Sequence, residues 1–231
     1  MRSLKAAAPF PASTIGRLIL TVFLLASAAQ VLAQAPAFST SNLDFSALPC
    51  GPSSCVSSST SLDFGPDGRL YVIQRSGDIN IFTVSQAGAN DYDATDVETI
   101  TTVTSIPNHN DTGTVISNSN RQATGITVVG TAENPILYAT SSDPRVGAGT
   151  GGNDIGIDTN SGVITRIECT GGINVGGPND GQCAAWTTVD LVRGLPRSEE
   201  NHATNGLEFV TIGTTDYLIV TQGGHTNAGS P

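Results

Sequence analysis

The sequence predicts an all-β protein built from repeated antiparallel strand units, and three observations support this prediction. Short runs of alternating apolar and polar residues recur along the chain, and turn sequences separate them. The 26 Gly and 12 Pro residues suit a chain with many tight turns. No segment after residue 33 has a helical period. Repeated antiparallel units favour a β-propeller, with a β-sandwich as the alternative.

Residues 1–33 are predicted to be a secretory signal peptide. Basic Arg2, Lys5 and Arg17 precede an apolar run over residues 18–29, and small residues follow at the positions that a signal peptidase reads. The run is shorter than the ~20 residues that span a bilayer, so a membrane anchor is the less favoured alternative. We therefore expect a secreted, periplasmic or cell-surface protein that is not inserted in a membrane after signal removal.

The chain is strongly acidic. Removing residues 1–33 takes away three basic residues and no acidic ones, so the formal charge changes from −10 to −13, with 7 basic residues left against 20 acidic. This balance argues against nucleic acid and anionic membranes as partners. It suits calcium or a neutral saccharide as a ligand.

Four cysteines predict two disulfides. A Ser-rich leader over residues 34–60 contains Cys50 and Cys55, and Cys169 and Cys183 follow much later. An even number of cysteines in an exported chain favours local pairing, Cys50 with Cys55 and Cys169 with Cys183. A zinc site is the alternative, but no histidine lies close to either pair in the sequence.

A strand–turn–strand unit recurs three times within residues 61–231, the predicted propeller domain. The turns contain Gly-Pro-Asp-Gly, Asn-Pro or Gly, whose backbone preferences suit tight turns. The first copy also continues into a third strand at residues 79–82. The strand pairs are 62–64 with 70–73, 126–128 with 136–139, and 207–209 with 217–220.

A polar loop carries His202 directly into the third copy. The loop reads Leu195-Pro-Arg-Ser-Glu-Glu-Asn-His-Ala-Thr-Asn-Gly-Leu-Glu-Phe209. Histidine side chains titrate near pH ~6.5, which suits general-base catalysis. This loop resembles the corresponding loop of the pyrroloquinoline quinone-dependent soluble glucose dehydrogenase and sorbosone dehydrogenase family, and the resemblance extends from about residue 60 onwards. The alternative is a solvated loop with an incidental histidine.

The resemblance implies a six-bladed β-propeller, here an incomplete N-terminal portion of about three blades, with the remaining blades missing from this chain. It implies that His202 takes a proton from a sugar hydroxyl while pyrroloquinoline quinone (PQQ) accepts hydride. It places Gln122 or Arg121 against the quinone, because these residues precede the second copy as a glutamine-bearing loop does in the family. Asn205 is a further candidate for cofactor binding. A structural role at the propeller rim is the alternative for Arg121 and Gln122.

Two segments rich in acidic residues are candidate calcium loops, and calcium is also a cofactor that the family resemblance implies. Residues 91–98 carry carboxylates at short intervals. Residues 141–160 mix Gly with Asp and Asn, and there the candidate ligands are Asp143, Asp154 and Asp158. Neither segment matches the EF-hand pattern, and solvated acidic loops are the alternative.

The function expected from these features is that of an exported sugar dehydrogenase-like protein, which when complete oxidises a sugar or a sugar-derived alcohol or aldehyde. The portion encoded here is expected to be inactive alone, because a quinone site needs contacts from many blades. The alternative is a non-catalytic β-propeller of a secreted or cell-surface protein that binds carbohydrate or protein partners.

Overall fold

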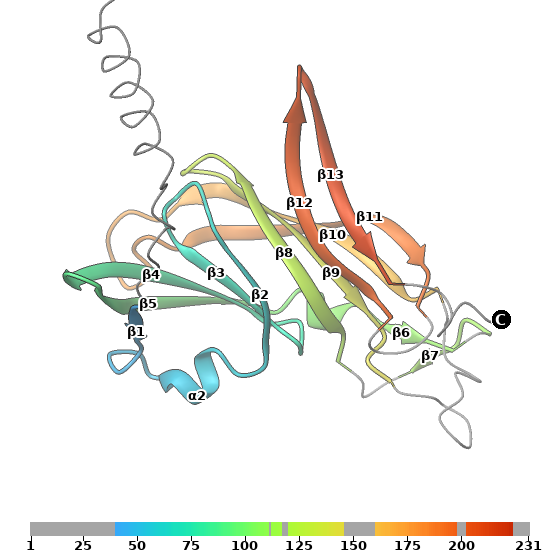
Figure 1. Cartoon of the computed structure of the whole chain (residues 1–231), viewed down its shortest axis with the longest axis horizontal. Helices are drawn as coiled ribbons and strands as arrows, with labels where there is room; N and C mark the ends of the chain where they lie inside the picture. The colour runs from blue at the N-terminus through green and yellow to red at the C-terminus, as the bar shows by residue number, and fades with distance from the viewer. Residues whose placement is uncertain (1–39, 111, 117–119, 146–159, 198–201, 224–231) are drawn as a thin grey trace, which may run out of the picture. The chain divides into compact units, whose positions relative to one another are not determined.

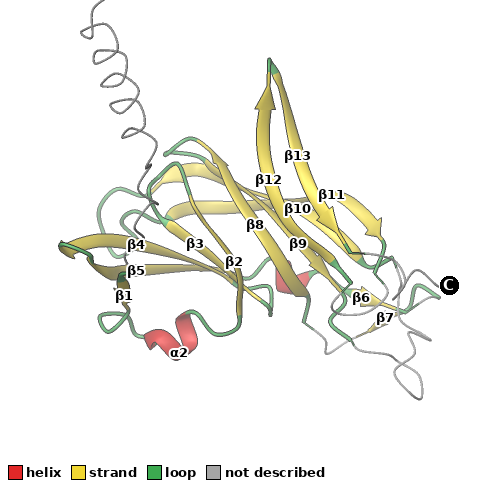
Figure 2. Cartoon of the chain, in the orientation of Figure 1, coloured by secondary structure: helices red, strands yellow, loops and turns green. Residues whose placement is uncertain are grey.

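The computed structural model describes residues 40–110, 112–116, 120–145, 160–197 and 202–223. Contacts divide the chain into two units, Met1–Thr40 and Ser41–Pro231, and every described strand belongs to the second. The predicted signal peptide lies outside the described residues. Strands dominate the described part of the chain, with short helical turns at α2 (Gly51–Cys55) and η1 (Val103–Ser105) (Figure 2). The prediction of an all-β fold is confirmed.

The first sheet has five strands in the order β1-β5-β4-β3-β2 (Figure 1). Four of them form an antiparallel meander, and β1 adds in parallel beside β5. Gly68 has a positive φ of 77° in the turn between the first two strands of the meander, where its lack of a side chain avoids strain. The strands are β1 (Asn42–Asp44), β2 (Ser59–Phe64), β3 (Leu70–Gln74), β4 (Ile79–Gly88) and β5 (Asp91–Ile100).

The second sheet has four antiparallel strands in the order β11-β10-β9-β8. A separate antiparallel hairpin pairs β12 with β13, and β6 pairs with β7. Among the described residues these sheets do not close into a propeller ring. The strands are β6 (Asn108–His109), β7 (Val115–Ile116), β8 (Gln122–Gly130), β9 (Pro135–Ser142), β10 (Gly162–Ile173), β11 (Cys183–Leu195), β12 (Thr204–Ile212) and β13 (Thr215–Gln222).

All three strand pairs predicted from alternation are confirmed, as β2–β3, β8–β9 and β12–β13. The prediction of an acidic loop over residues 91–98 is wrong, because this segment forms most of β5. Its carboxylates lie on a strand whose burial alternates, and Glu98 points into the protein with 9% of its surface exposed.

The main hydrophobic core lies between the first and second sheets. Tyr71, Ile73 and Ile79 of the first sheet pack with Ile126 and Leu137 of the second. A second core covers the other face of the first sheet, where the leader packs on the strands. The leader contributes Leu48 and Cys55, with Leu43, Phe45 and Cys50 beside them, and the strands contribute Leu70, Val72, Phe82 and Ala94. The Ser-rich leader is therefore part of the folded domain from β1 onwards.

Both predicted disulfides are present. Cys50–Cys55 links residues in the leader, with Cα atoms 5.4 Å apart, and Cys169–Cys183 links β10 to β11, with Cα atoms 5.8 Å apart. Two disulfides indicate an oxidising, extracytoplasmic environment. In the described part of the chain, no helix has the length and hydropathy needed to cross a bilayer.

A buried carboxylate joins the first two sheets. Glu98 of β5 accepts hydrogen bonds from the Trp186 indole (2.5 Å) and from the backbone N–H of Cys183 (3.2 Å) in β11. It also forms an ion pair with Arg69 at 2.7 Å. Arg69 in turn pairs with Asp67 at 2.6 Å, and the Tyr71 hydroxyl donates to Asp67 at 2.7 Å. Burial raises the pKa of Tyr71 well above its ordinary value, so its phenol stays protonated.

The strands β2, β8 and β12, which open the three repeated units, pack beside one another. Threonine hydroxyls link them. The Thr60 hydroxyl in β2 donates to the Ala123 carbonyl in β8 at 2.9 Å, and the Thr124 hydroxyl in β8 donates to the Thr204 carbonyl in β12. These bonds fix the register of the three strands. The residues that precede β2, β8 and β12 therefore lie at the same end of these strands.

Candidate functional site

The structure brings Gln122 and His202 to matching positions at the start of neighbouring strands. Each lies two residues before a threonine, and the two threonines, Thr124 and Thr204, are hydrogen-bonded to each other across β8 and β12. The surrounding sequences also match, since Ala-Thr follows both Gln122 and His202. Two residues proposed for one site, 80 positions apart in the sequence, are therefore placed at one end of the molecule.

A glycine makes this close approach of β8 and β12 possible. A Cβ atom added to Gly125 would lie 2.6 Å from the Asn205 carbonyl oxygen and 2.9 Å from the Thr140 hydroxyl. Real side chains do not tolerate such distances, so any larger residue would push the strands apart. Gly125 thereby sets the distance between the two strand starts.

His202 is half-buried and lies two residues before β12. Its backbone packs against the end of β13, because a Cβ added to Gly223 would lie 2.8 Å from the His202 Cα. The Gly223 N–H also donates to the Ala203 carbonyl at 3.0 Å. The position of His202 is thus fixed from both strands of the hairpin. The charged residues that precede it, Glu199 and Glu200, lie outside the described residues.

Arg121 is a structural residue in this arrangement. Only 2% of its surface is exposed, and its guanidinium donates to the Asn108 amide oxygen (2.8 Å), to the Ser141 carbonyl (3.1 Å) and to the Ser161 carbonyl (2.5 Å). A fourth bond, from Nε, reaches the Ser141 hydroxyl at 3.4 Å. Four of the five guanidinium N–H donors are therefore directed at this chain and not at a ligand.

Asn205 also serves the fold. Its side-chain amide donates to the Ala203 carbonyl at 3.2 Å, and its own carbonyl accepts a 2.7 Å hydrogen bond from Thr140. Gln122 is half-buried at the first position of β8, where it pairs with Ser142 of β9. Of the cofactor-binding candidates, Gln122 is the one whose position is level with His202.

Asp143 has an arginine partner. Its carboxylate is fully buried and both of its oxygens accept hydrogen bonds from Arg145, at 2.5 to 3.0 Å. A cation beside this pair would be repelled by the guanidinium, so the pair does not fit a calcium ligand. Within the described ranges, no group of three His, Cys, Asp or Glu side chains could hold a metal. Asp154 and Asp158 lie outside the described residues, so calcium in that loop stays a prediction.

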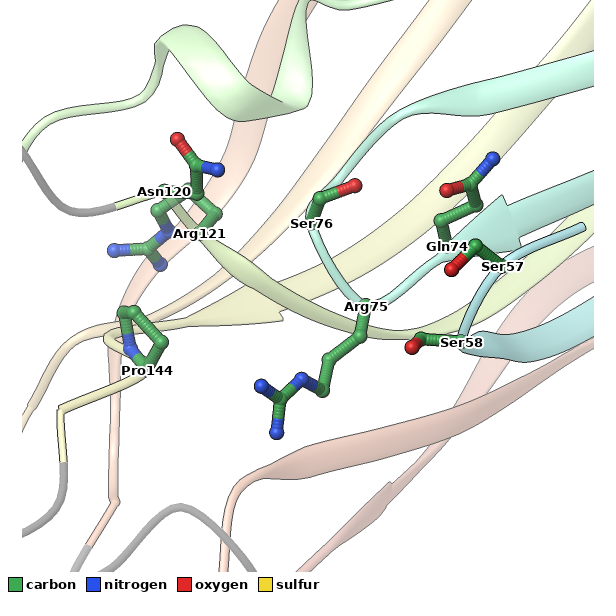
Figure 3. Close-up of a pocket in the computed structure, with 8 residues that line it drawn as sticks. All are labelled: Ser57, Ser58, Gln74, Arg75, Ser76, Asn120, Arg121 and Pro144. Carbon is green, nitrogen blue, oxygen red and sulfur yellow. The ribbon is translucent and has the colours of Figure 1, made fainter. Parts of the chain in front are cut away.

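A polar pocket of about 250 Å³ opens beside the start of β8 (Figure 3). It lies between the segment before β2, the turn after β3 and Pro144, which follows β9. No Asp or Glu is among the described residues that line it, although the chain is strongly acidic. The lining residues are Ser57, Ser58, Gln74, Arg75, Ser76, Asn120, Arg121 and Pro144.

The sequence interpretation treated Arg75 only as part of a connection between strands. A usable signal was present, because the turn after β3 falls at the same end of the first sheet as the start of β2. In an antiparallel meander, odd-numbered connections share one end and even-numbered connections share the other. The cationic residue in the Arg75-Ser-Gly-Asp78 turn could therefore have been placed at the same end as the start of β2.

Comparison with known proteins returned no match: no family model, no curated protein and no solved structure is significantly similar to this chain.

Proposed function

We propose that this chain is part of an exported β-propeller that binds a sugar or a sugar-derived alcohol or aldehyde at the end where β2, β8 and β12 begin, and that the complete protein oxidises this ligand with a quinone. The observation that carries the proposal is that Gln122 and His202 each lie two residues before one of two hydrogen-bonded threonines, Thr124 and Thr204, on adjacent strands. The resemblance of the His202 loop to quinone-dependent sugar dehydrogenases supplies the reaction type.

The repeated architecture supports the propeller part of the proposal. Two successive antiparallel meanders, β2 to β5 and β8 to β11, present their first strands side by side, and β12 continues the series. Propeller blades are four-stranded meanders whose first strands line a central axis. Each described unit would then be one blade, with β12–β13 as the first half of a third.

His202 is the proposed proton acceptor. Its backbone is held by both strands of the hairpin, which limits the positions its imidazole can reach. A sugar hydroxyl that lies against the ring would lose its proton to a ring nitrogen as the carbon–hydrogen bond is broken. A bound quinone would supply the hydride acceptor for this step.

The remaining candidates differ in how well they fit such a cofactor. Gln122 fits, because it lies level with His202 and offers both an amide donor and an acceptor. Arg121 does not fit as a ligand for quinone carboxylates, because its donors are used within the chain. The role we assign to Arg121 is to hold the starts of β8 and β10 together through the Ser141 and Ser161 carbonyls.

A second candidate function is carbohydrate binding without catalysis. The internal use of Arg121 favours it, because a quinone site would lose a cationic contact while a neutral saccharide needs none. Hydroxyl and amide side chains around the start of β8, such as Ser58 and Asn120, suit hydrogen bonding to sugar hydroxyls.

The test compares His202→Ala with His109→Ala, a control that removes the other described histidine, in β6. In a protein that contains the complete propeller, supplied with PQQ and calcium, His202→Ala should lower the turnover of aldoses, sugar alcohols or sorbosone by roughly 10²–10⁴-fold. His109→Ala should leave the turnover nearly unchanged.

Ligand binding separates the two candidate functions. If no substrate in the panel is oxidised but glycan binding is lost in His202→Ala, the second function holds. If both variants keep oxidation and binding at the level of the unaltered protein, His202 is not part of the site.

A further inference from the structure

We propose that the pocket beside Arg75 is a binding site for a carboxylate group, carried either by an acidic sugar such as a uronic acid or by a small organic acid. This site is separate from the proton-transfer step assigned to His202 and does not depend on a quinone. It follows from the rigidity of the Arg75 backbone, the exposure of its guanidinium and the chemistry of the pocket wall.

The backbone of Arg75 is fixed on both sides. Its N–H donates to the Ser58 carbonyl at 2.9 Å, and its own carbonyl accepts from the Ala123 N–H at 3.0 Å. The turn that follows is closed by the Gly77 N–H, which donates to the Gln74 carbonyl at 2.9 Å. Arg75 therefore bridges the residues before β2 to the start of β8, and its side chain leaves the chain from a well-defined point.

The guanidinium of Arg75 is available to a ligand. Arg75 is exposed, and no side-chain ion pair or hydrogen bond engages it among the described residues. The ion pairs between described residues involve other arginines: Arg69, Arg145, Arg166 and Arg193. The planar guanidinium of an arginine binds a carboxylate through two parallel N–H···O bonds. This geometry favours planar oxyanions over neutral hydroxyl groups.

The described residues of the pocket wall add hydrogen-bond donors and include no carboxylate. Ser57, Ser58 and Asn120 supply hydroxyl and amide groups, and Arg121, whose donors are used within the chain, forms part of the wall (Figure 3). The nearest acid in the turn, Asp78, does not line the pocket and is held by the Ser76 hydroxyl at 2.9 Å. In a chain with twice as many acidic as basic residues, a pocket lined by the exposed Arg75 and by no Asp or Glu among its described residues is a local reversal of charge.

Ser58 gives an independent sign of a specialised site. It has a φ of 53°, and the only other non-glycine with positive φ among the described residues is Asn90. A side chain in this left-handed region is strained, and such positions concentrate at binding sites. Here the unusual backbone directs the Ser58 carbonyl to the Arg75 N–H and turns the chain around the pocket.

The experiment titrates the full chain with sodium glucuronate, sodium acetate and glucose at constant ionic strength, observed by NMR of the backbone amides and the Arg75 Nε–H. Glucuronate should bind saturably and shift the signals of Arg75, Ser58 and Ser76. Acetate binding with similar affinity would identify a small organic acid as the source of the carboxylate. Binding of glucuronate alone would identify an acidic sugar.

Two variants test the role of the guanidinium. Arg75→Gln should weaken glucuronate binding at least tenfold, and Arg75→Lys should weaken it less, because it keeps the charge but loses the fork. Arg193→Gln removes an exposed arginine that does not line this pocket and should leave the affinity unchanged. Thermal unfolding of each variant verifies that it is folded. Equal binding of glucose and glucuronate, or an unchanged affinity in Arg75→Gln, would overturn the proposal.

Discussion

The second sheet and the β12–β13 hairpin begin with nearly the same sequence and the same pair of strands, yet they differ in burial. Both open with Ala-Thr, followed within two residues by a glycine and an apolar residue. In β9 six of the eight positions are buried, including the last four, whereas in β13 six of the eight positions are exposed. The difference arises because β9 has β10 on its other edge, and β13 has no such neighbour among the described strands.

The two faces of the hairpin show the same effect. Phe209 packs toward the second sheet, where its ring stacks on Tyr138 with centroids 5.9 Å apart. The opposite face exposes Ile212, Tyr217 and Ile219, each at about half or more of its surface. Identical alternation can therefore give a buried strand or an exposed one, and the neighbouring strands decide which.

The largest expected effect concerns the buried link between the first two sheets, which the hairpin lacks. Glu98→Gln should lower the free energy of unfolding by about 3–5 kcal/mol, because it breaks the buried ion pair with Arg69, which keeps only Asp67, and removes the charged acceptor of the Trp186 indole. Urea denaturation measures the change. Glu208→Gln on the hairpin, an exposed position, should stay within about 0.5 kcal/mol. Equal effects of the two variants would show that the two regions are stabilised alike.

The disulfides give the next effect. Replacing Cys169 and Cys183 with Ala should cost about 3 kcal/mol, and replacing Cys50 and Cys55 about 2 kcal/mol, because the closed loops differ in sequence separation, 14 against 5. The measurement is chemical denaturation of the two double variants under identical conditions. A larger loss for the leader pair would reverse the order that loop entropy requires.

The junction between the second sheet and the hairpin can be tested with two glycines. Gly125→Ala should destabilise by about 1–3 kcal/mol, because the new methyl group would overlap the Asn205 carbonyl. Gly206→Ala is the matched control, since its nearest neighbour would be the Thr221 hydroxyl at 3.8 Å. Hydrogen exchange of β12 and β13 should increase in the first variant and not in the second.

The smallest effect appears at high pH. The raised pKa of Tyr71 means that the folded state keeps a proton that the unfolded state loses above pH ~10. The free energy of unfolding should be unaffected by this group below that pH and should then fall by up to ~1.4 kcal/mol per pH unit. Tyr71→Phe should abolish this dependence, whereas Tyr217→Phe, at an exposed position, should preserve it. An unchanged slope in Tyr71→Phe would exclude Tyr71 as its source.

Alternation and turn chemistry were sufficient to predict β2, β3, β8, β9, β12 and β13, because each has an apolar face and a glycine or proline turn. They failed for β5, whose carboxylates are satisfied by partners distant in sequence, such as Arg69 for Glu98 and Gln182 for Asp96. They also missed the long hairpin of β10 and β11, because most positions of β11 are exposed and its apolar and polar residues do not alternate.

The candidate site, like the fold, could be predicted only in part, because local patterns do not reveal partners that are distant in the sequence. His202 and Gln122 could be proposed because each precedes a recognisable strand. The role of Arg121 could not be decided, because its acceptors Asn108, Ser141 and Ser161 become neighbours only after three segments of the chain have folded together. Arg75 was overlooked because nothing local distinguishes it from an ordinary turn residue.

The contacts of Glu98 also bear on the order in which the protein folds. Its partners Arg69, Cys183 and Trp186 are 29, 85 and 88 residues away. Contacts of such high sequence separation require the closure of long loops, which slows the folding of β proteins. The meanders, whose pairings are local, can form first, and the bonds to Glu98 can form only when both are in place. Glu98→Gln should consequently accelerate unfolding far more than it slows folding, so that its main consequence is a shorter lifetime of the native state.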